Sequence, residues 1–409
     1  MTGRTFDLST LMKILTTSTY KNLEKNHSLL KEELQRLDIP TNDHEELIKK
    51  ILKIVKITKN PKTRESHLQS YFRIYQQGIN KDGRGSSIII EITKRCDKHC
   101  IHCYSKCTSK QQDMSDALLH TLIAYARQHF KHVFITGGEP TVDERIFLVA
   151  ESNPDMLFFV FTNGSRITKD YAKRLSFFGN IIPVLGIDGI SLSMHDSLRG
   201  TGSYKEVMAA IDALNTHNVS WGYISLITEL NAQDMLSQRF IQDMINKGAF
   251  LARYIEYLPV GSTPQKELIL SGDTYYFLEK RKKEIIKSGE IYMQEISQAK
   301  CKGLLYFTVD GDLKNCICFH YAKYNISSCD ITSAIKQTQK EWISYNWDGE
   351  CPIYADPKGL KKHLEKCGWK NLSSANESYL SDTKITNMLK RNYNHFLKIK
   401  GQRKHGHFS

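Results

Sequence analysis

Residues 90–107 read IEITKRCDKHCIHCYSKC, with Cys96, Cys100 and Cys103 in the pattern C-x3-C-x2-C directly after an apolar run. Cysteine thiolates are the usual ligands of iron-sulfur clusters, and a [4Fe-4S] cluster offers four irons. Three protein ligands would leave one iron open. A zinc knuckle usually pairs its cysteines as C-x2-C doublets and closes four ligands, and buried free thiols are the other alternative. The spacing therefore favours a cluster with one open iron.

This spacing after a strand, with His102-Cys103-Tyr104 around the last ligand, resembles the signature of the radical S-adenosylmethionine (SAM) superfamily. The resemblance implies that the open iron binds the amino and carboxylate groups of SAM. It also implies that an electron from the reduced cluster cleaves the sulfonium to a 5′-deoxyadenosyl radical. The cofactors implied are SAM and the SAM-binding [4Fe-4S] cluster.

Around this loop, apolar runs alternate with amphipathic stretches. We expect helices at residues 115–130, 169–178, 203–217 and 232–247, and strands at residues 87–93, 132–137, 156–162, 189–194, 219–227 and 250–258. Residues 181–185 are also apolar and compete for the fourth strand. Such repetition predicts parallel strands with right-handed crossovers. The expected fold is α/β, and six strands match the partial (β/α)6 TIM-like barrel of the family, with the site at the C-terminal strand ends.

The second and third strands end in sequences that resemble SAM-binding motifs. Gly137, Gly138 and Glu139 resemble the family's GGE motif, which implies contacts from the backbone and the carboxylate to the SAM amino group. Asn163, in Thr-Asn-Gly, resembles the turn that lies near the ribose. A tight turn is the structural alternative for both, because glycine and asparagine are common turn residues.

Further SAM contacts are implied near the fourth and fifth strands. Ser191 keeps the place of a family serine that contacts SAM, while Ser193 stands where relatives often have Asp. Arg199 keeps the place of an arginine that pairs with the SAM carboxylate, a task suited to a planar bidentate donor. Ser225 could reach the ribose or adenine, and a plain strand-end hydroxyl is the equal alternative. Catalytic residues are not identified; Asp188, Glu229 and Glu256 are candidates by position only.

A second set of cysteines begins at Cys301. Two short strands, at residues 306–309 and 313–317, are expected around the Asp310-Gly311 turn, and the spacing from Cys301 to Cys316 resembles the opening of SPASM and Twitch extensions. The full SPASM cysteine run is absent. The resemblance therefore implies a small α+β Twitch-like domain with one auxiliary [4Fe-4S] cluster. Its ligands would be Cys301, Cys316 and Cys351, with either Cys318 or Cys329 as a fourth or with one iron left open; free thiols are the alternative.

These patterns divide the 409 residues into four parts: an N-terminal helical region (1–85), the barrel (86–262), the auxiliary-cluster domain (263–373) and a basic C-terminal helix and tail (374–409). The N-terminal part is expected to be a helical cap, with recognition of a partner or substrate as the alternative. Ten cysteines in a chain without an export signal point to metal binding in the cytoplasm. The sequence has no apolar run of 18 residues, so it predicts no membrane helix.

The formal net charge of +13 raises nucleic acid as a partner. The basic residues are spread over residues 49–64, 280–287, 358–370 and 398–404, so a solvated surface is the preferred interpretation. The expected function is radical SAM chemistry, with hydrogen abstraction from a substrate carbon in peptide or protein (RiPP-type) maturation. The alternatives are modification of a small metabolite, sugar or cofactor precursor, and an RNA-binding protein with structural clusters. An electron donor such as flavodoxin or ferredoxin is the expected partner.

Overall fold

The computed structural model describes residues 9–18, 20–25, 27–37, 39, 44–45, 47–49, 51–52, 55, 61–76, 87–105, 112–130, 132–260, 264–293, 304–318, 320–344, 351–372, 380 and 382–405. No helix in these segments is long and apolar enough to cross a lipid bilayer.

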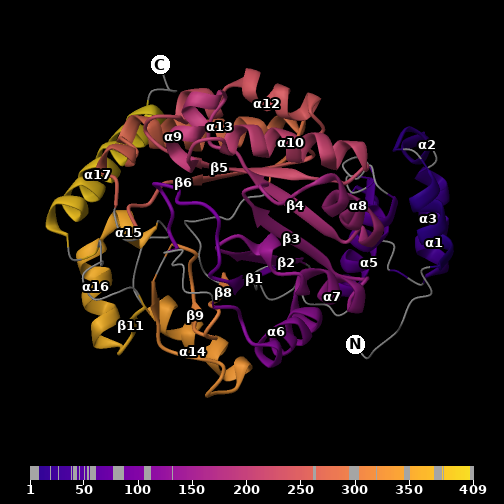
Figure 1. Cartoon of the computed structure of the whole chain (residues 1–409), viewed down its shortest axis with the longest axis horizontal. Coiled ribbons are helices and arrows are strands. Elements are labelled where there is room, and N and C mark those ends of the chain that lie inside the picture. The colour runs from indigo at the N-terminus through magenta and orange to yellow at the C-terminus, as the bar shows by residue number, and fades with distance from the viewer. Residues whose placement is uncertain are drawn as a thin grey trace.

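Six parallel strands form the centre of the molecule. They are β1 (Ser87–Thr93), β2 (His132–Gly137), β3 (Leu157–Thr162), β4 (Ile181–Gly186), β5 (Gly222–Ile227) and β6 (Leu251–Glu256), and each pairs with the next. The connecting helices are α6 (Asp116–His129), α7 (Arg145–Ser152), α8 (Lys169–Phe178), α9 (Leu192–Arg199), α10 (Ser203–Thr216), α11 (Ala232–Met235) and α12 (Gln238–Asn246). In Figure 1 these helices surround the curved sheet. The predicted α/β partial barrel is confirmed.

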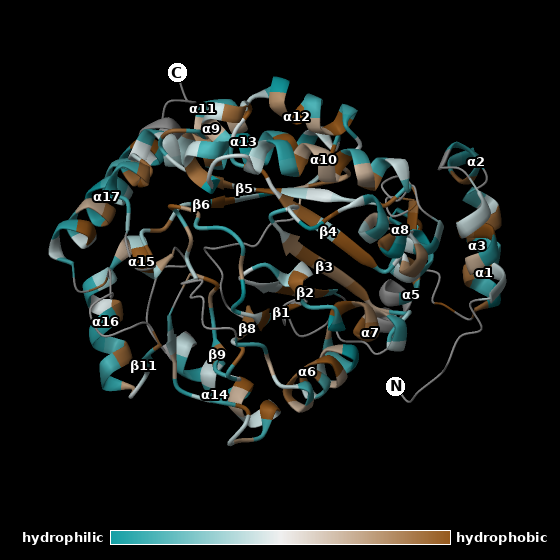
Figure 2. Ribbon diagram, in the orientation of Figure 1, coloured by the Kyte–Doolittle hydropathy of each residue, from teal (hydrophilic) through white to brown (hydrophobic). Residues whose placement is uncertain are grey.

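The strands are apolar because both of their faces are covered. Every residue of β2, β4 and β6 is buried. Hydrophobic colouring runs along β3 and β4 in Figure 2, whereas the outer helices have apolar and polar faces. A parallel sheet with helices on its outer face leaves little strand surface in water, so its strands read as continuous apolar runs.

The fourth strand is where the sequence prediction was wrong. The strand is β4 at Ile181–Gly186, which is the competing apolar run. The end of the predicted strand at residues 189–194 instead belongs to α9, which spans Leu192–Arg199. The Ser191 side chain accepts a hydrogen bond from the backbone N–H of Met194, as an N-cap residue does. The apparent alternation at residues 189–194 was therefore the beginning of a helix.

The predicted helix at residues 232–247 is also interrupted. It consists of α11 and α12, because Ser237 leaves the helical conformation and its side chain accepts a hydrogen bond from Phe240 N. In addition, α7 and the 3₁₀ turn η2 (Pro140–Val142) lie between β2 and β3, where the sequence analysis had given no bounds for a helix.

The C-terminal part continues the same sheet. It contains η3 (Lys266–Leu268), α13 (Gly272–Ser288), β7 (Tyr292–Met293), β8 (Leu305–Phe307), β9 (Leu313–Lys314), β10 (Tyr321–Ala322), α14 (Ile331–Ser344), α15 (Pro352–Ala355), α16 (Pro357–Lys366), β11 (Lys370–Asn371) and α17 (Thr383–His405). The predicted hairpin is β8–β9. Its strand β8 pairs in parallel with β1, and β7 pairs with β6, so a nine-stranded sheet crosses the boundary proposed at residue 262.

The N-terminal helices have a hydrophobic cluster of their own. The described elements are α1 (Ser9–Thr17), α2 (Tyr20–Lys25), α3 (His27–Arg36) and α5 (Pro61–Gln76), and side chains from Leu11 to Leu68 form the cluster. Figure 1 shows these helices at the edge of the molecule beside α8. Lys62 of α5 donates from Nζ to the carbonyl oxygen of Phe177, at 2.6 Å. The N-terminal region is thus helical where the structure describes it, with α5 next to the barrel.

Candidate functional site

A cavity opens at the C-terminal ends of the barrel strands. Its volume is about 1060 Å³, counting the space that opens to solvent. The lining comes from every barrel strand end and from the C-terminal part: Cys96, Lys98, Cys100, His102, Cys103, Tyr104, Thr136, Gly137, Gly138, Glu139, Phe161, Thr162, Asn163, Gly186, Arg199, Ile224, Leu226, Ile255, Tyr257, Leu258, Val260, Ile317 and Cys318. Charged and sulfur-bearing groups lie mostly on the β1–β4 side, and aliphatic groups mostly on the β5–β6 side.

The three cysteines predicted as cluster ligands all line this cavity. Cys96, Cys100 and Cys103 are partly buried and form no disulfide. The thiol of Cys103 contacts the carbonyl oxygen of Ser105 at 2.6 Å. Among the residues that the structure describes, no three His, Cys, Asp or Glu side chains enclose a metal-ion position. The donor set itself, three thiols from one loop at the mouth of a cavity, fits a cluster with three protein ligands and an open iron.

The cysteine loop is fixed by contacts to several strand ends. The carboxylate of Asp97 accepts hydrogen bonds from Asn163 Nδ2 at 2.8 Å and from Ser165 Oγ at 2.6 Å. The backbone N–H of Ile101 donates to the carbonyl oxygen of Leu198 in α9. Such contacts reduce the freedom of the loop before any metal binds, which lowers the entropy lost on binding.

A buried charged cluster links this loop to Arg199. Asp188 is fully buried, and its carboxylate lies 2.5 Å from Arg199 Nε and 2.9 Å from His102 Nε2. Its Oδ1 also accepts a hydrogen bond from Leu226 N at 2.8 Å. Burial alone raises the pKa of an acid, but the Arg199 guanidinium and the His102 ring hold the pKa of Asp188 well below its usual range. Asp188 is therefore ionised and orients Arg199.

Space for the guanidinium of Arg199 comes from Gly186 at the end of β4. A Cβ at Gly186 would lie 2.4 Å from Arg199 Nη1, so a larger residue would displace the arginine. Because Nε is bound to Asp188, the terminal Nη atoms are the donors left to face the cavity that Arg199 lines. Two parallel N–H groups are suited to a carboxylate ligand.

The Gly137-Gly138-Glu139 turn lies against the beginning of the cysteine loop. A Cβ at Gly138 would lie 2.2 Å from the carbonyl oxygen of Arg95, and one at Gly137 would lie 2.3 Å from that of Thr93. Backbone N–H groups of Gly138 and Glu139 donate to these two oxygens. The glycines thus permit close contact with the cysteine loop, a structural role that agrees with the tight turn given as the alternative in the sequence analysis.

The carboxylate of Glu139 is buried but well supplied with donors. Oε1 accepts hydrogen bonds from Thr141 N, Thr141 Oγ1 and Thr162 Oγ1, and Oε2 accepts one from Asn163 N at 2.7 Å. Burial nevertheless raises the pKa of Glu139 above its usual value. Oε2 has capacity for a further donor, which the amino group of a bound ligand would satisfy.

The other predicted SAM contacts are divided between the cavity and its surroundings. Gly137, Gly138, Glu139, Asn163 and Arg199 line the cavity, and their contacts with SAM stay a prediction. Ser191 is an exposed helix cap outside it. Ser225 is buried and donates to the carbonyl oxygen of Ile187 at 2.5 Å, also outside the cavity lining.

Sequence reasoning did not give Tyr104, Thr136 or Tyr257 a place in the site. All three line the cavity, and the Tyr104 and Thr136 hydroxyls are 3.1 Å apart. Their positions directly beside the Cys103 and Gly137 motifs are the signal that could have identified Tyr104 and Thr136.

The second cysteine set lies beside the same cavity. Cys301 is outside the described residues, while Cys316, Cys318 and Cys351 are buried. A hydrogen bond with Cys316, together with burial, raises the pKa of Cys318 well above its usual value. Cys329 is exposed, with its sulfur 3.1 Å from the carbonyl oxygen of Asn325. Of the two candidates for a fourth ligand, Cys318 is therefore the one placed beside Cys316.

The cavity of this parallel partial barrel has three cysteines after the first strand and carboxylate, amide and guanidinium groups across from them, a set of side chains that suits an iron-sulfur cluster and a ligand with amino and carboxylate groups. The sequence profile of the radical SAM superfamily matches residues 90–237. This segment of the chain belongs to the radical SAM superfamily.

Known proteins resemble the chain in sequence and in fold. The sporulation killing factor maturation protein SkfB of Bacillus subtilis (strain 168) is 27% identical over 180 residues, which cover 43% of this chain and 43% of SkfB. Streptococcus suis SuiB bound to its precursor peptide SuiA is 14% identical and has a TM-score of 0.53, with 80% of each chain covered. Native anSMEcpe with bound AdoMet is 16% identical with a TM-score of 0.53 over 69% of this chain and 96% of that one.

These similarities confirm the radical SAM assignment of residues 90–237 and the predicted barrel fold. The sequence match spans less than half of the length of SkfB.

Proposed function

We propose that this chain is a radical SAM enzyme that modifies a peptide or protein substrate. The observation that carries the proposal is the meeting of Cys96, Cys100 and Cys103 with Glu139 and Arg199 around one cavity. When bound, a [4Fe-4S] cluster on these cysteines supplies the electron that cleaves SAM to a 5′-deoxyadenosyl radical, which abstracts hydrogen from a substrate carbon.

The residues around the cysteines would bind and orient SAM. Glu139 Oε2 would accept from the amino group, because it has one hydrogen-bond donor in the structure and can take another. The Nη atoms of Arg199, whose Nε is held by Asp188, would pair with the carboxylate. The aliphatic side chains of Ile224, Leu226 and Ile255 would cover the far side and exclude water from a reactive carbon radical.

An auxiliary [4Fe-4S] cluster on Cys301, Cys316, Cys351 and Cys318 is the second part of the proposal. Its support is the burial of three of these cysteines together, with Cys318 also lining the SAM cavity. Cysteines placed this way would hold the second cluster next to the substrate, where it could exchange electrons with a substrate radical.

Peptide maturation is preferred over small-molecule chemistry because SkfB is a maturation protein by name and SuiB has been solved with a precursor peptide. A net charge of +13 would suit an anionic peptide segment. An external one-electron donor such as flavodoxin or ferredoxin is required for the cleavage step, and a cytoplasmic location would supply one.

The test is anaerobic quantification of 5′-deoxyadenosine. The chain is reconstituted with iron and sulfide and given SAM and dithionite, with and without a peptide-rich or a small-molecule fraction of the source cells. We expect deoxyadenosine from the wild-type protein, stimulated by the peptide-rich fraction. Stimulation by the small-molecule fraction alone would instead favour metabolite chemistry.

Two cysteine variants make this assay specific. Cys96→Ala should abolish deoxyadenosine formation, whereas Cys329→Ala, the same chemical change at an exposed cysteine outside both proposed ligand sets, should not. Deoxyadenosine production by Cys96→Ala at the wild-type rate would refute the proposal. For the auxiliary cluster, Cys316→Ala combined with Cys351→Ala should remove about half of the bound iron and leave SAM binding in place. Unchanged iron content would exclude it.

A further inference from the structure

The segment that leads from β1 to the first cluster cysteine is held by carboxylates from two distant parts of the chain. Asp113 Oδ1 accepts hydrogen bonds from Thr93 Oγ1 at 2.5 Å and from Arg95 Nε at 2.8 Å. Lys94, between them, donates from Nζ to Asp310 Oδ2 in the β8–β9 turn at 2.9 Å. Each of the three residues at positions 93–95 therefore has a fixed carboxylate partner.

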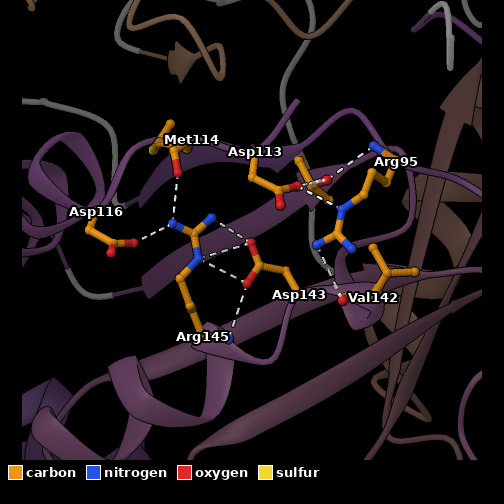
Figure 3. Close-up of polar contacts among 8 residues, drawn as sticks. Arg95, Asp113, Met114, Asp116, Val142, Asp143 and Arg145 are labelled. Atoms are coloured by element: carbon orange, nitrogen blue, oxygen red, sulfur yellow. Dashed lines mark hydrogen bonds and ion pairs between the residues drawn. The ribbon is translucent and has the colours of Figure 1, made fainter. Parts of the chain in front are cut away.

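The segment that carries Asp113 is itself held by a second arginine. Figure 3 shows Arg145 between Asp143, Asp116 and the backbone of Met114. Arg145 donates from Nη2 to Asp143 Oδ2 at 2.6 Å and from Nη1 to the Met114 carbonyl oxygen at 2.7 Å. Side-chain hydrogen bonds to Asp143 raise the pKa of Arg145 above its usual value, so this arginine remains charged.

The two arginine sites meet on the turn that follows Glu139. Arg95 Nη2 lies 3.4 Å from the carbonyl oxygen of Val142, as Figure 3 also shows, and Asp143 is the next residue. The carbonyl oxygen of Arg95 accepts a hydrogen bond from Glu139 N at 2.7 Å. Thus Arg95 contacts Asp113 through its side chain and Glu139 through its backbone, and it directly precedes Cys96.

Movement of Arg95 would therefore displace an iron ligand and a proposed SAM ligand together. Gly138 packs closely against Arg95 and Cys96: a Cβ at Gly138 would lie 2.6 Å from the Arg95 carbonyl carbon and 2.9 Å from Cys96 Cβ. The Asp113 and Arg95 side chains are about one third exposed, so their ion pair adds little to global stability. The Asp113–Arg95 ion pair has a small effect on stability but is directly connected to Cys96 and Glu139. It is therefore suited to positioning these two residues.

We propose that Asp113 is a positioning residue for the cluster loop: with Arg145 as its support, it sets Arg95 and hence the placement of Cys96 relative to Glu139. This inference rests on the proposed function, because the proposed function is what assigns Cys96 as an iron ligand and Glu139 as a SAM ligand. It adds two residues, Asp113 and Arg145, that lie outside the cavity lining.

The experiment compares the reconstituted wild-type chain with Asp113→Ala, Arg145→Ala and the control Asp155→Asn. Asp155 forms an ion pair of 3.1 Å with Arg127 of α6. Three quantities are measured: the rate of iron loss to bathophenanthroline disulfonate, the Kd for SAM, and the change that SAM causes in the EPR spectrum of the reduced cluster. Thermal unfolding of the iron-free proteins serves as the structural readout.

We expect Asp113→Ala to increase both the rate of iron loss and the Kd for SAM by roughly tenfold, because charge-assisted hydrogen bonds no longer fix the site. Its unfolding temperature should match that of Asp155→Asn. Arg95→Ala/Asp113→Ala should be only slightly worse than Asp113→Ala alone, because the Arg95–Asp113 contact is lost in both and the double variant loses only the longer Arg95–Val142 contact in addition. Asp113→Asn should recover part of the effect, since its amide oxygen can still accept from Thr93.

Iron retention, SAM affinity and EPR response equal to those of Asp155→Asn would overturn the proposal. So would a fall in unfolding temperature large enough to account for the iron loss in both Asp113→Ala and Asp113→Asn. A wild-type protein that takes up iron but cleaves no SAM would refute the proposed function while the iron-loss comparison still decides the role of Asp113. A wild-type protein that takes up no iron at this loop would refute both.

Discussion

Replacing Asp188 by Asn should destabilise the barrel by about 3 kcal/mol at pH 7. Removing one partner of a buried ion pair costs roughly 3–5 kcal/mol, because the other charge is left without compensation. Here the charge left behind is Arg199, whose side chain is 14% exposed. An Asn at this position keeps the hydrogen bond from Leu226 N, so the lower end of the range applies.

The pH dependence gives this prediction a sign. The pKa of Asp188 is depressed in the folded protein relative to an ordinary Asp value of about 3.9 in the unfolded chain. An acid whose pKa is lower in the folded protein contributes stability that is fully present above its pKa in the unfolded chain. That stability is lost as the pH falls through its pKa in the folded protein. The stability difference between wild type and Asp188→Asn should therefore be constant near neutral pH and shrink below about pH 4.

The assay is urea unfolding of the iron-free proteins across this pH range, followed by tryptophan fluorescence, since Trp221 is fully buried in the barrel. Asp212→Asn makes the same chemical change at an exposed position of α10 and should leave the midpoint unchanged. A difference below about 1 kcal/mol at pH 7, or one that grows on acidification, would refute the assignment of Asp188 as the buried partner of Arg199.

Three further changes test other contacts. Glu139→Gln should weaken SAM binding by roughly tenfold in equilibrium dialysis, because a charge-assisted hydrogen bond to the amino group becomes neutral; an unchanged Kd would exclude that contact. Gly138→Ala should lower iron uptake on reconstitution, since its Cβ would lie 2.2 Å from the Arg95 carbonyl oxygen, and wild-type iron content would contradict the close packing. Arg253→Met should stabilise the iron-free protein by about 1–2 kcal/mol in urea, because no residue in the described segments forms a hydrogen bond with the buried guanidinium; destabilisation would show that its contacts with Phe134 and Phe161 outweigh its desolvation.

The residues that line the cavity were predictable where they belong to short contiguous sequence motifs. The three cysteines and the Gly137-Gly138-Glu139 turn are contiguous motifs at the ends of strands, so identifying the strand places the motif. Parallel strands bring their C-terminal ends to one edge, which is why Asn163 contacts Glu139 although it lies 24 positions further along the chain.

Contacts between residues far apart in the chain were not predictable in this way. Asp188 was a candidate by position only, because nothing local indicates that His102 and Arg199 converge on it. Ser191 was assigned to a strand although a serine ahead of a helical segment is a common N-cap. The local alternation of apolar residues outweighed that signal, and the cap geometry became clear only in the structure.

The pairing of β8 with β1 has a consequence for how the chain is made. Ile88 pairs with Leu305, so the ribosome must synthesise roughly 200 further residues, on the order of 10–40 s of elongation, before the first barrel strand acquires its second neighbour. During that interval one edge of β1 carries unpaired backbone groups, as does any strand at the border of a sheet. Chains released before residue 305 would keep this edge, and with it a tendency to associate, for as long as they exist.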